Sequence, residues 1–330
     1  MPSIHPSPHL HYNTCVAGWL PPAHDTKEGW VIPRPRLLWY FVPVALAAAV
    51  LIFLWVRPMF AGERPIDPFL LVLGPVRIRW YGFLIAFSFI PGFYIAAAEA
   101  RRKGIDPEVL YDFALLAGAS GFVGARLAYV LQNVGYYLSE PARIIAVWEG
   151  GLSMHGVIAG GLLAVFAYAR KLQVPFLTFA DVVLPALPLG QALGRWGNFF
   201  NQELFGYPTD VPWKMYVAPE YRPPEWAAEA FFHPTFLYES LWNFAVFGLL
   251  LWYRRRPQAR EGDVLFMYLA AYSLGRFWVE FFRIGTPVAG GLTLAQLVSL
   301  GLAALSGLWL LFRHRQPLKN PPPASRRLGR

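Results

Sequence analysis

Long apolar stretches dominate this sequence and restrict the folds that are open to it. Each has roughly 18 to 24 residues, enough to cross a bilayer core of about 30 Å as a helix. They begin near residues 37, 81, 109, 152, 176, 235, 263 and 291. Hydrophobic residues make up 56% of the 330-residue chain and charged residues only 15%, unlike an ordinary soluble domain. We therefore expect an all-α, polytopic integral membrane protein.

The expected organisation is a seven-helix membrane core at residues 80–313, preceded by an extra transmembrane helix at residues 37–56. The polar leader at 1–36 is expected to be disordered and cytoplasmic. Residues 57–79 would link the extra helix to the core on the outer side, and 314–330 would form a basic cytoplasmic tail.

Clusters of Lys and Arg set the predicted orientation, because short cytoplasmic loops carry an excess of both residues. The clusters fall on alternate loops, at residues 101–103, 170–171, 254–256 and 313–330. Segments 135–150 and 196–234 then lie on the outer face.

The net charge of +9 is concentrated in these short loops, where topology and anionic lipid headgroups explain it. We therefore expect the lipid bilayer, and no nucleic acid, as a partner. A single cysteine, Cys15, excludes an internal disulfide framework. No set of His, Cys, Asp or Glu has metal-ligand spacing, so no metal is expected.

One predicted span contains ionisable side chains on a single helical face. In "YSLGRFWVEFFR", Tyr272, Arg276, Glu280 and Arg283 follow at intervals of four, four and three. A structural ion pair, or snorkelling from the helix end, would account for Glu280 and one arginine. The second arginine is then expected to lack a partner. A spare cation that faces a cavity would suit the phosphate of an anionic lipid.

A second polar block, "GRWGNFFNQELFGYPT", follows the apolar run that ends at Leu193. Arg195, Asn198 and either Asn201 or Gln202 fall at helical spacing, and together they offer a guanidinium fork and amides to an oxygen-rich ligand. Gly206 is expected to let the backbone turn back toward the cavity. A helix cap with an interfacial anchor is the alternative interpretation.

A third motif, "HGVIAGG", places His155 at the start of a span in which Gly160 and Gly161 would allow close helix packing. His155 could take a proton near pH 7, but a buried, hydrogen-bonded histidine is an equally good interpretation. Other polar residues in or beside spans could also serve a site or simply join helices. These are Arg126, Asp181, His233, Tyr238, Glu239 and Asn243.

These motifs resemble those of the bacterial prolipoprotein diacylglyceryl transferases over roughly residues 76–312. The stretches IRWYG, GARLAYVL, VWEGGLSMHG, HPTFLYES and GRFWVEFFR occur in the order of that family. Its signature GRxGNFxNxExxG is present in full, as Gly194, Arg195, Gly197, Asn198, Phe199, Asn201, Glu203 and Gly206.

The resemblance implies a transfer reaction in the bacterial cytoplasmic membrane, with the active site toward the outer side. The diacylglyceryl group of phosphatidylglycerol would move to the lipobox cysteine thiol in the signal peptide of a preprolipoprotein. A thioether would form and glycerol 1-phosphate would leave, without a metal or other cofactor.

Carried over by position, the resemblance implies that Arg195 and Arg276 handle the phosphate, with His155 as the base and Tyr81 completing the centre. Residues implied in donor binding are Arg195, Asn198, Asn201, Glu203, Gly206 and Arg276. Supporting residues are Tyr272, Glu280, Arg283, Arg126, His233 and Glu239. The sequence departs from the family at Val157, where the family has glycine, and in an N-terminal addition through residue 64.

Two other function classes compete with a transferase. A lipid or solute transporter is expected to show inverted repeats with broken helices, and none is visible in the sequence. "GASG" at residues 118–121 is similar to a motif of intramembrane serine proteases. Close packing of the small residues Gly118, Gly121 and Gly124 explains these four residues better.

Overall fold

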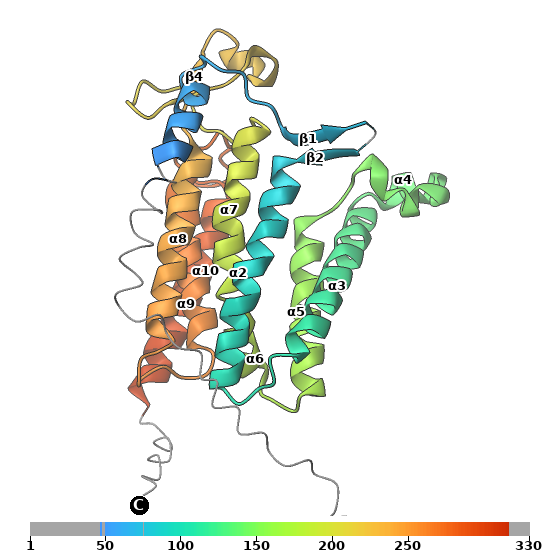
Figure 1. Cartoon of the computed structure of the whole chain (residues 1–330), viewed down its shortest axis with the longest axis vertical. Coiled ribbons are helices and arrows are strands. Elements are labelled where there is room, and N and C mark those ends of the chain that lie inside the picture. The colour runs from blue at the N-terminus through green and yellow to red at the C-terminus, as the bar shows by residue number, and fades with distance from the viewer. Residues whose placement is uncertain (1–46, 48–49, 75, 317–330) are drawn as a thin grey trace, which may run out of the picture. The chain divides into compact units, whose positions relative to one another are not determined.

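The computed structural model describes residues 47, 50–74 and 76–316 (Figure 1). The chain divides into two units, Met1–Val56 and Arg57–Arg330. The predicted leader and most of the predicted extra helix and basic tail lie outside the described residues. A short apolar helix, Val50–Phe60, crosses the boundary between the units, and all that follows concerns the second unit.

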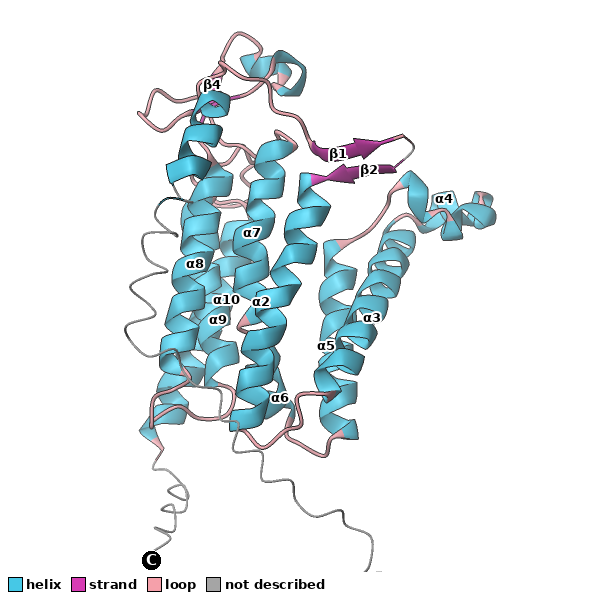
Figure 2. Ribbon diagram, viewed as in Figure 1, coloured by secondary structure: helices cyan, strands magenta, loops and turns pink. Residues whose placement is uncertain are grey.

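Helices form the second unit (Figure 2). In each predicted core span the structure has a helix that begins within three residues of the expected position. The helices are α2 (Trp80–Arg102), α3 (Val109–Gln132), α4 (Val134–Ser139), α5 (Met154–Lys171), α6 (Phe176–Val183), α7 (Ala186–Phe200), α8 (Thr235–Tyr253), α9 (Asp263–Val279) and α10 (Leu294–Arg315).

Four stretches of helix in the described chain are long and apolar enough to cross a membrane: α2, α3, α10, and α6 with α7 taken together. The α6–α7 stretch has 44% of its apolar window buried, against 17–22% for the other three, so it lies deepest in the bundle. Helices α5, α8 and α9 are shorter or more polar. The molecule is therefore a helical membrane protein.

Packing orders the helices as α2, α7, α8, α9 and α10, while α3 and α5 form a pair that shares an apolar core with α2 and α6 (Figure 1). Glycine allows that pair to approach closely, since a Cβ at Gly156 would lie 2.0 Å from the carbonyl oxygen of Gly124. The Ser120 hydroxyl donates to the Gly160 carbonyl at 3.0 Å. Close packing of small residues, predicted for the stretch around GASG, is thus confirmed at Gly124, whereas Gly118 faces open space. Ser120 takes part in the same helix contact through its hydrogen bond.

A break separates α6 from α7 at Pro185, which has no backbone N–H to continue the first helix. Helix α7 then runs to Phe200, beyond the predicted end of the apolar run at Leu193. Arg195 and Asn198 are therefore helical residues.

Two small antiparallel sheets depart from the all-helical expectation. β1 (Phe69–Leu73) pairs with β2 (Val76–Arg79) inside the predicted linker, where Gly74 has the positive φ of a tight turn. β3 (Met215–Tyr216) pairs with β4 (Phe231–Phe232) in the segment between α7 and α8. These strands are too short to give a clear alternating pattern, so helix-length windows miss them.

Candidate functional site

Three arginines and two glutamates converge where α7, α8 and α9 pack together. Arg195 lies on α7, Glu239 on α8 and Arg276 on α9, while Glu280 and Arg283 follow directly after α9. Their side chains are only 6–21% exposed. We call these five residues the arginine–glutamate cluster.

Glu239 is the centre of this cluster because it contacts all three arginines. One of its oxygens forms an ion pair with Arg195. The other, Oε1, lies 2.9 Å from Nη1 of Arg283 and 3.9 Å from Nη1 of Arg276. The expectation of an arginine without a partner is therefore wrong: α8 supplies a carboxylate that the spacing on α9 could not reveal.

Glu280 provides the second carboxylate. Its Oε2 lies 2.5 Å from Nη1 of Arg276 and 4.0 Å from Nε of Arg283. Its Oε1 accepts a hydrogen bond of 2.9 Å from the hydroxyl of Thr293. Thr293 is also the N-cap of α10, in a capping box with Gln296. The start of α10 therefore helps to hold Glu280.

The cluster carries one net positive charge, because three guanidiniums face two carboxylates. Buried cations and carboxylates interact more strongly than they would in water. A cluster of this charge suits one additional anion, and the planar arginine forks match the oxygens of a phosphate group. The charge and the donors of the cluster are therefore those of an anion-binding site.

A chain of side chains extends from Arg195 along the polar block. Nη1 of Arg195 donates to Oδ1 of Asn198 at 3.4 Å. The amides of Asn198 and Asn201 both donate to Oε1 of Glu203, at 2.8 and 3.1 Å. Glu203 therefore orients Asn198, which in turn contacts the arginine.

The backbone after α7 turns back over the cluster at two residues with positive φ, Gln202 and Leu204. The expectation that Gly206 makes this turn is wrong, because Gly206 has no positive φ. Its role is close contact: a Cβ there would lie 2.2 Å from the carbonyl oxygen of Phe282. Gly206 also forms a bridge with Arg283, so the polar block is joined directly to the cluster.

His233 lies beside this bridge, and its carbonyl accepts from the backbone N–H of Gly206 at 2.9 Å. Its Nδ1 is 3.0 Å from the hydroxyl of Tyr238, which accepts from the indole N–H of Trp213 at 2.8 Å. Partial burial lowers the pKa of His233. A neutral histidine therefore supports the turn.

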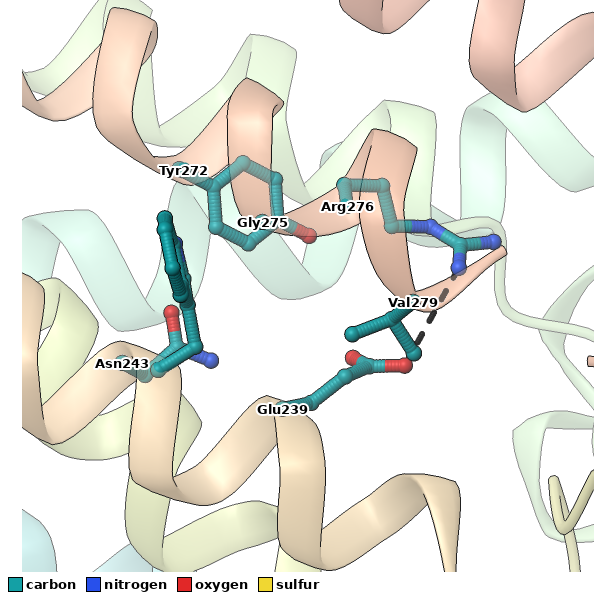
Figure 3. Close-up of a pocket in the computed structure, with 7 residues that line it drawn as sticks. Glu239, Asn243, Tyr272, Gly275, Arg276 and Val279 are labelled. Atoms are coloured by element: carbon teal, nitrogen blue, oxygen red, sulfur yellow. Dashed lines mark ion pairs between the residues drawn. The ribbon is translucent and has the colours of Figure 1, made fainter. Parts of the chain in front are cut away.

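A cavity of about 10 Å³ lies between α8 and α9, next to the cluster (Figure 3). Tyr272, Arg276, Glu239 and Asn243 line it, and its size corresponds to one water molecule. Oδ1 of Asn243 is buried without a hydrogen-bond partner among the described residues, so a water here would satisfy it. The face shared by Tyr272 and Arg276 thus points toward α8.

Tyr81 lies on α2 against α7, close to the polar block. A Cβ at Gly197 would be 2.3 Å from Cδ2 of Tyr81, so only glycine allows this contact. The tyrosine remains 37% exposed, which leaves part of its ring accessible.

Arg126 and His155 lie on the α3–α5 pair, outside the arginine–glutamate cluster. The guanidinium of Arg126 is saturated by backbone carbonyls and holds the segment between α4 and α5. Its acceptors are Arg143, Ile144, Ala146, Gly150 and Gly151. His155 is exposed in the first turn of α5, and no hydrogen bond or ion pair joins it to the cluster within the described residues. Val157 lies 3.7 Å from where a Cβ at Gly121 would be and remains 41% exposed, so it is accommodated beside α3.

Sequence reasoning missed two residues of this region. Thr293 was not predicted, although the order Thr293–Gln296 before an apolar run is a recognisable capping signal. Trp242 was also missed: its indole occupies the space beside Gly275, where a Cβ would lie 2.1 Å from its Nε1. No local pattern could have indicated that contact, because α8 and α9 supply one residue each.

Fold and site together define a helical membrane protein with a buried, cationic site suited to a phosphate group. The family model for prolipoprotein diacylglyceryl transferase matches residues 68–313, and the chain belongs to this family.

Curated relatives named phosphatidylglycerol–prolipoprotein diacylglyceryl transferase match along most of their length. The protein from Nostoc sp. is 44% identical over 269 residues, 79% of this chain and 95% of the relative. The one from Thermosynechococcus vestitus is 48% identical over 246 residues, covering 74% and 91%. The one from Thermotoga maritima is 41% identical over 272 residues, covering 81% and 92%.

Proposed function

We propose that this protein transfers the diacylglyceryl group of phosphatidylglycerol to the cysteine thiol of a prolipoprotein. The observation that carries the proposal is the arginine–glutamate cluster, in which Arg195 of the family signature meets Arg276 around one carboxylate. Its relatives are named for the same reaction. The acceptor is the lipobox cysteine of the signal peptide.

The donor phosphate binds between Arg195 and Arg276 in this proposal. Phosphatidylglycerol is a phosphate diester with one negative charge, which complements the single net positive charge of the cluster. Glu239, Glu280 and Arg283 hold the two arginines in place. The chain of Asn198, Asn201 and Glu203 and the contact at Gly206 shape the site around the glycerol headgroup.

The chemistry requires the thiolate sulfur to attack the glycerol carbon that bears the phosphate. A C–S bond forms, the C–O bond breaks, and the electron pair leaves on glycerol 1-phosphate. The leaving phosphate gains negative charge as the bond breaks, so fixed guanidiniums stabilise the transition state more than the bound donor. The thiol proton goes to a base, and His155 is the residue proposed for this role. Tyr81, which is also proposed to be catalytic, lies against Gly197 of α7.

The proposed setting is the bacterial cytoplasmic membrane, crossed by the seven core spans at residues 80–313 and by an extra helix at 37–56. The arginine–glutamate cluster then faces the outer leaflet. Basic loops beside the opposite ends of the helices support this orientation.

One assay tests the function directly. The purified chain is incubated with phosphatidylglycerol and a lipobox peptide, and the peptide is analysed by mass spectrometry. We expect a mass gain of one diacylglyceryl unit on cysteine, together with release of glycerol 1-phosphate. A cysteine-to-serine peptide is the matched control. An unmodified peptide, with the enzyme folded and both substrates present, would refute the proposal.

A further inference from the structure

We propose a second lipid-binding site at the other end of α8, which takes an anionic glycerophospholipid of the leaflet opposite to the arginine–glutamate cluster. Leu251, Trp252, Arg255 and Arg256 line an open hollow of about 490 Å³ there. The hollow is open to the surface, so a lipid headgroup could enter it from the membrane.

The position follows from the direction of α8, which leads away from the cluster to the opposite end of the bundle (Figure 1). Glu239 is in the second turn of this helix, and Arg255 and Arg256 follow its last residue, Tyr253. At 1.5 Å per residue, the last helical residue, Tyr253, lies about 21 Å from Glu239 along the helix axis, and Arg255 and Arg256 follow it. A bilayer core is about 30 Å thick, so the two sites belong to opposite leaflets.

The three consecutive arginines after α8 have different environments. Arg254 is buried, its Nε is 3.6 Å from Oε2 of Glu99 on α2, and its carbonyl accepts from Arg102 at 2.9 Å. Arg255 and Arg256 are exposed, and neither has a carboxylate partner among the described residues. Arg254 thus fixes the turn, while the next two guanidiniums remain available to a ligand.

The chemistry of the hollow matches a phospholipid at the membrane surface. The guanidinium of Arg256 lies 4.1 Å from the centroid of the Trp252 ring, a cation–π contact that fixes its direction. Trp252 is 56% exposed, as expected for an indole at the level of lipid headgroups. Leu251 offers apolar surface for the start of an acyl chain. Within the described chain these two arginines have no carboxylate partner, which favours a headgroup with net negative charge.

Phosphatidylserine is a suitable probe, because it is anionic and is not the proposed donor. Its binding to the full-length protein in detergent is measured by native mass spectrometry, with phosphatidylcholine for comparison. Each arginine near an anionic headgroup contributes about fivefold, so we expect about 30-fold tighter binding of phosphatidylserine. Equal binding of the two lipids would overturn the proposal.

The decisive variant is Arg255→Gln with Arg256→Gln, which we expect to lose this preference. Arg101→Gln with Arg315→Gln is the matched control, since it removes two exposed arginines from the same end of the bundle but none from the hollow. Arg276→Gln tests whether the lipid binds in the cluster instead. Both controls are expected to retain the preference, and thermal melting checks that each variant is folded.

Three results would place the lipid elsewhere on the protein. An equal loss in the control pair would mean that general surface charge attracts the lipid, and a loss in Arg276→Gln would place it at the cluster. If Arg255→Gln with Arg256→Gln leaves the preference for phosphatidylserine unchanged, the site is also refuted. That result is expected if another segment of the chain occupies the hollow.

Discussion

Glu239→Gln is the sharpest test of how the arginine–glutamate cluster is built. The substitution keeps the size of the side chain but removes the charge that contacts Arg195, Arg276 and Arg283. The net charge of the cluster rises from one to two. Glu239 is only 6% exposed, so bulk water has little access to replace the lost interactions.

The expected loss of stability follows from burial. Removing one partner of a buried ion pair costs about 3–5 kcal/mol, and the arginines keep 15–21% exposure, which favours the lower end, about 3 kcal/mol. For a chain of 330 residues, 3 kcal/mol corresponds to a fall in Tm of about 4 °C.

The effect of Glu239→Gln on kcat and KM shows whether Glu239 acts by positioning the arginines or only by setting the charge of the cluster. Without the Glu239 carboxylate the three arginines lose the ion pairs that position them. We therefore expect kcat to fall about a hundredfold, as for the loss of a preorganised electrostatic contact. KM for phosphatidylglycerol is not expected to rise, because the cluster has become more positive. Rates are measured per folded molecule, with Glu229→Gln, an exposed glutamate between α7 and α8, as the control. Wild-type Tm and kcat in Glu239→Gln would refute the reasoning.

Four further predictions concern separate features. Arg276→Lys is expected to lower transfer about a hundredfold, because an ammonium cannot reproduce the planar fork, and near-normal transfer would remove Arg276 from the site. Gly206→Ala is expected to lower stability by about 1–3 kcal/mol through its clash with the Phe282 carbonyl, whereas Gly161→Ala, with nothing within 4 Å, is expected to have little effect on Tm. In a Cys15→Ser background with intact cells, an impermeant thiol reagent is expected to label a cysteine at Lys214 and not one at Arg255, and the reverse pattern would invert the topology. Burial lowers the pKa of His233 in the folded protein, so below a pH of about 6.5 the unfolded chain binds more protons than the folded one. Tm is therefore expected to decrease as the pH falls below about 6.5, and to decrease less in His233→Gln.

Hydropathy alone predicted where each core span begins, because a stretch of apolar residues long enough to span a membrane has few alternatives to a helix. It did not predict α4 or the separate start of α7 at Ala186. The apolar run ends at Leu193, and it was the helical spacing of Arg195 and Asn198 that predicted a helix continuing beyond it, as α7 does to Phe200. Neither signal could predict the partners that these side chains find in Glu239 and Glu203, which allow the helix to continue through them.

The candidate site was only partly visible in the sequence for a related reason. Arg276 and Glu280 are four residues apart, so their contact follows from helix geometry. The contact of Arg283 with Glu239 spans 44 residues and depends on how α8 packs against α9. Glu239 therefore read as one of several residues that could simply join helices, although it contacts every arginine of the cluster.

The glycines of the signature show how packing and binding are combined in one motif. A Cβ at Gly194 would lie 2.7 Å from Ile85, and one at Gly197 would lie 2.3 Å from Tyr81, both on α2. A Cβ at Gly206 would strike the segment that follows α9. Gly197 therefore fixes α7 against the backbone of α2, whereas at Gly194 only the end of the Ile85 side chain would have to move. Gly206 fixes the returning chain next to Arg283, so Arg195 is held between two interfaces. Substitution of Gly197 or Gly206 is then expected to displace Arg195 without changing a charge, and loss of transfer in such a variant need not mean that a ligand contact was removed.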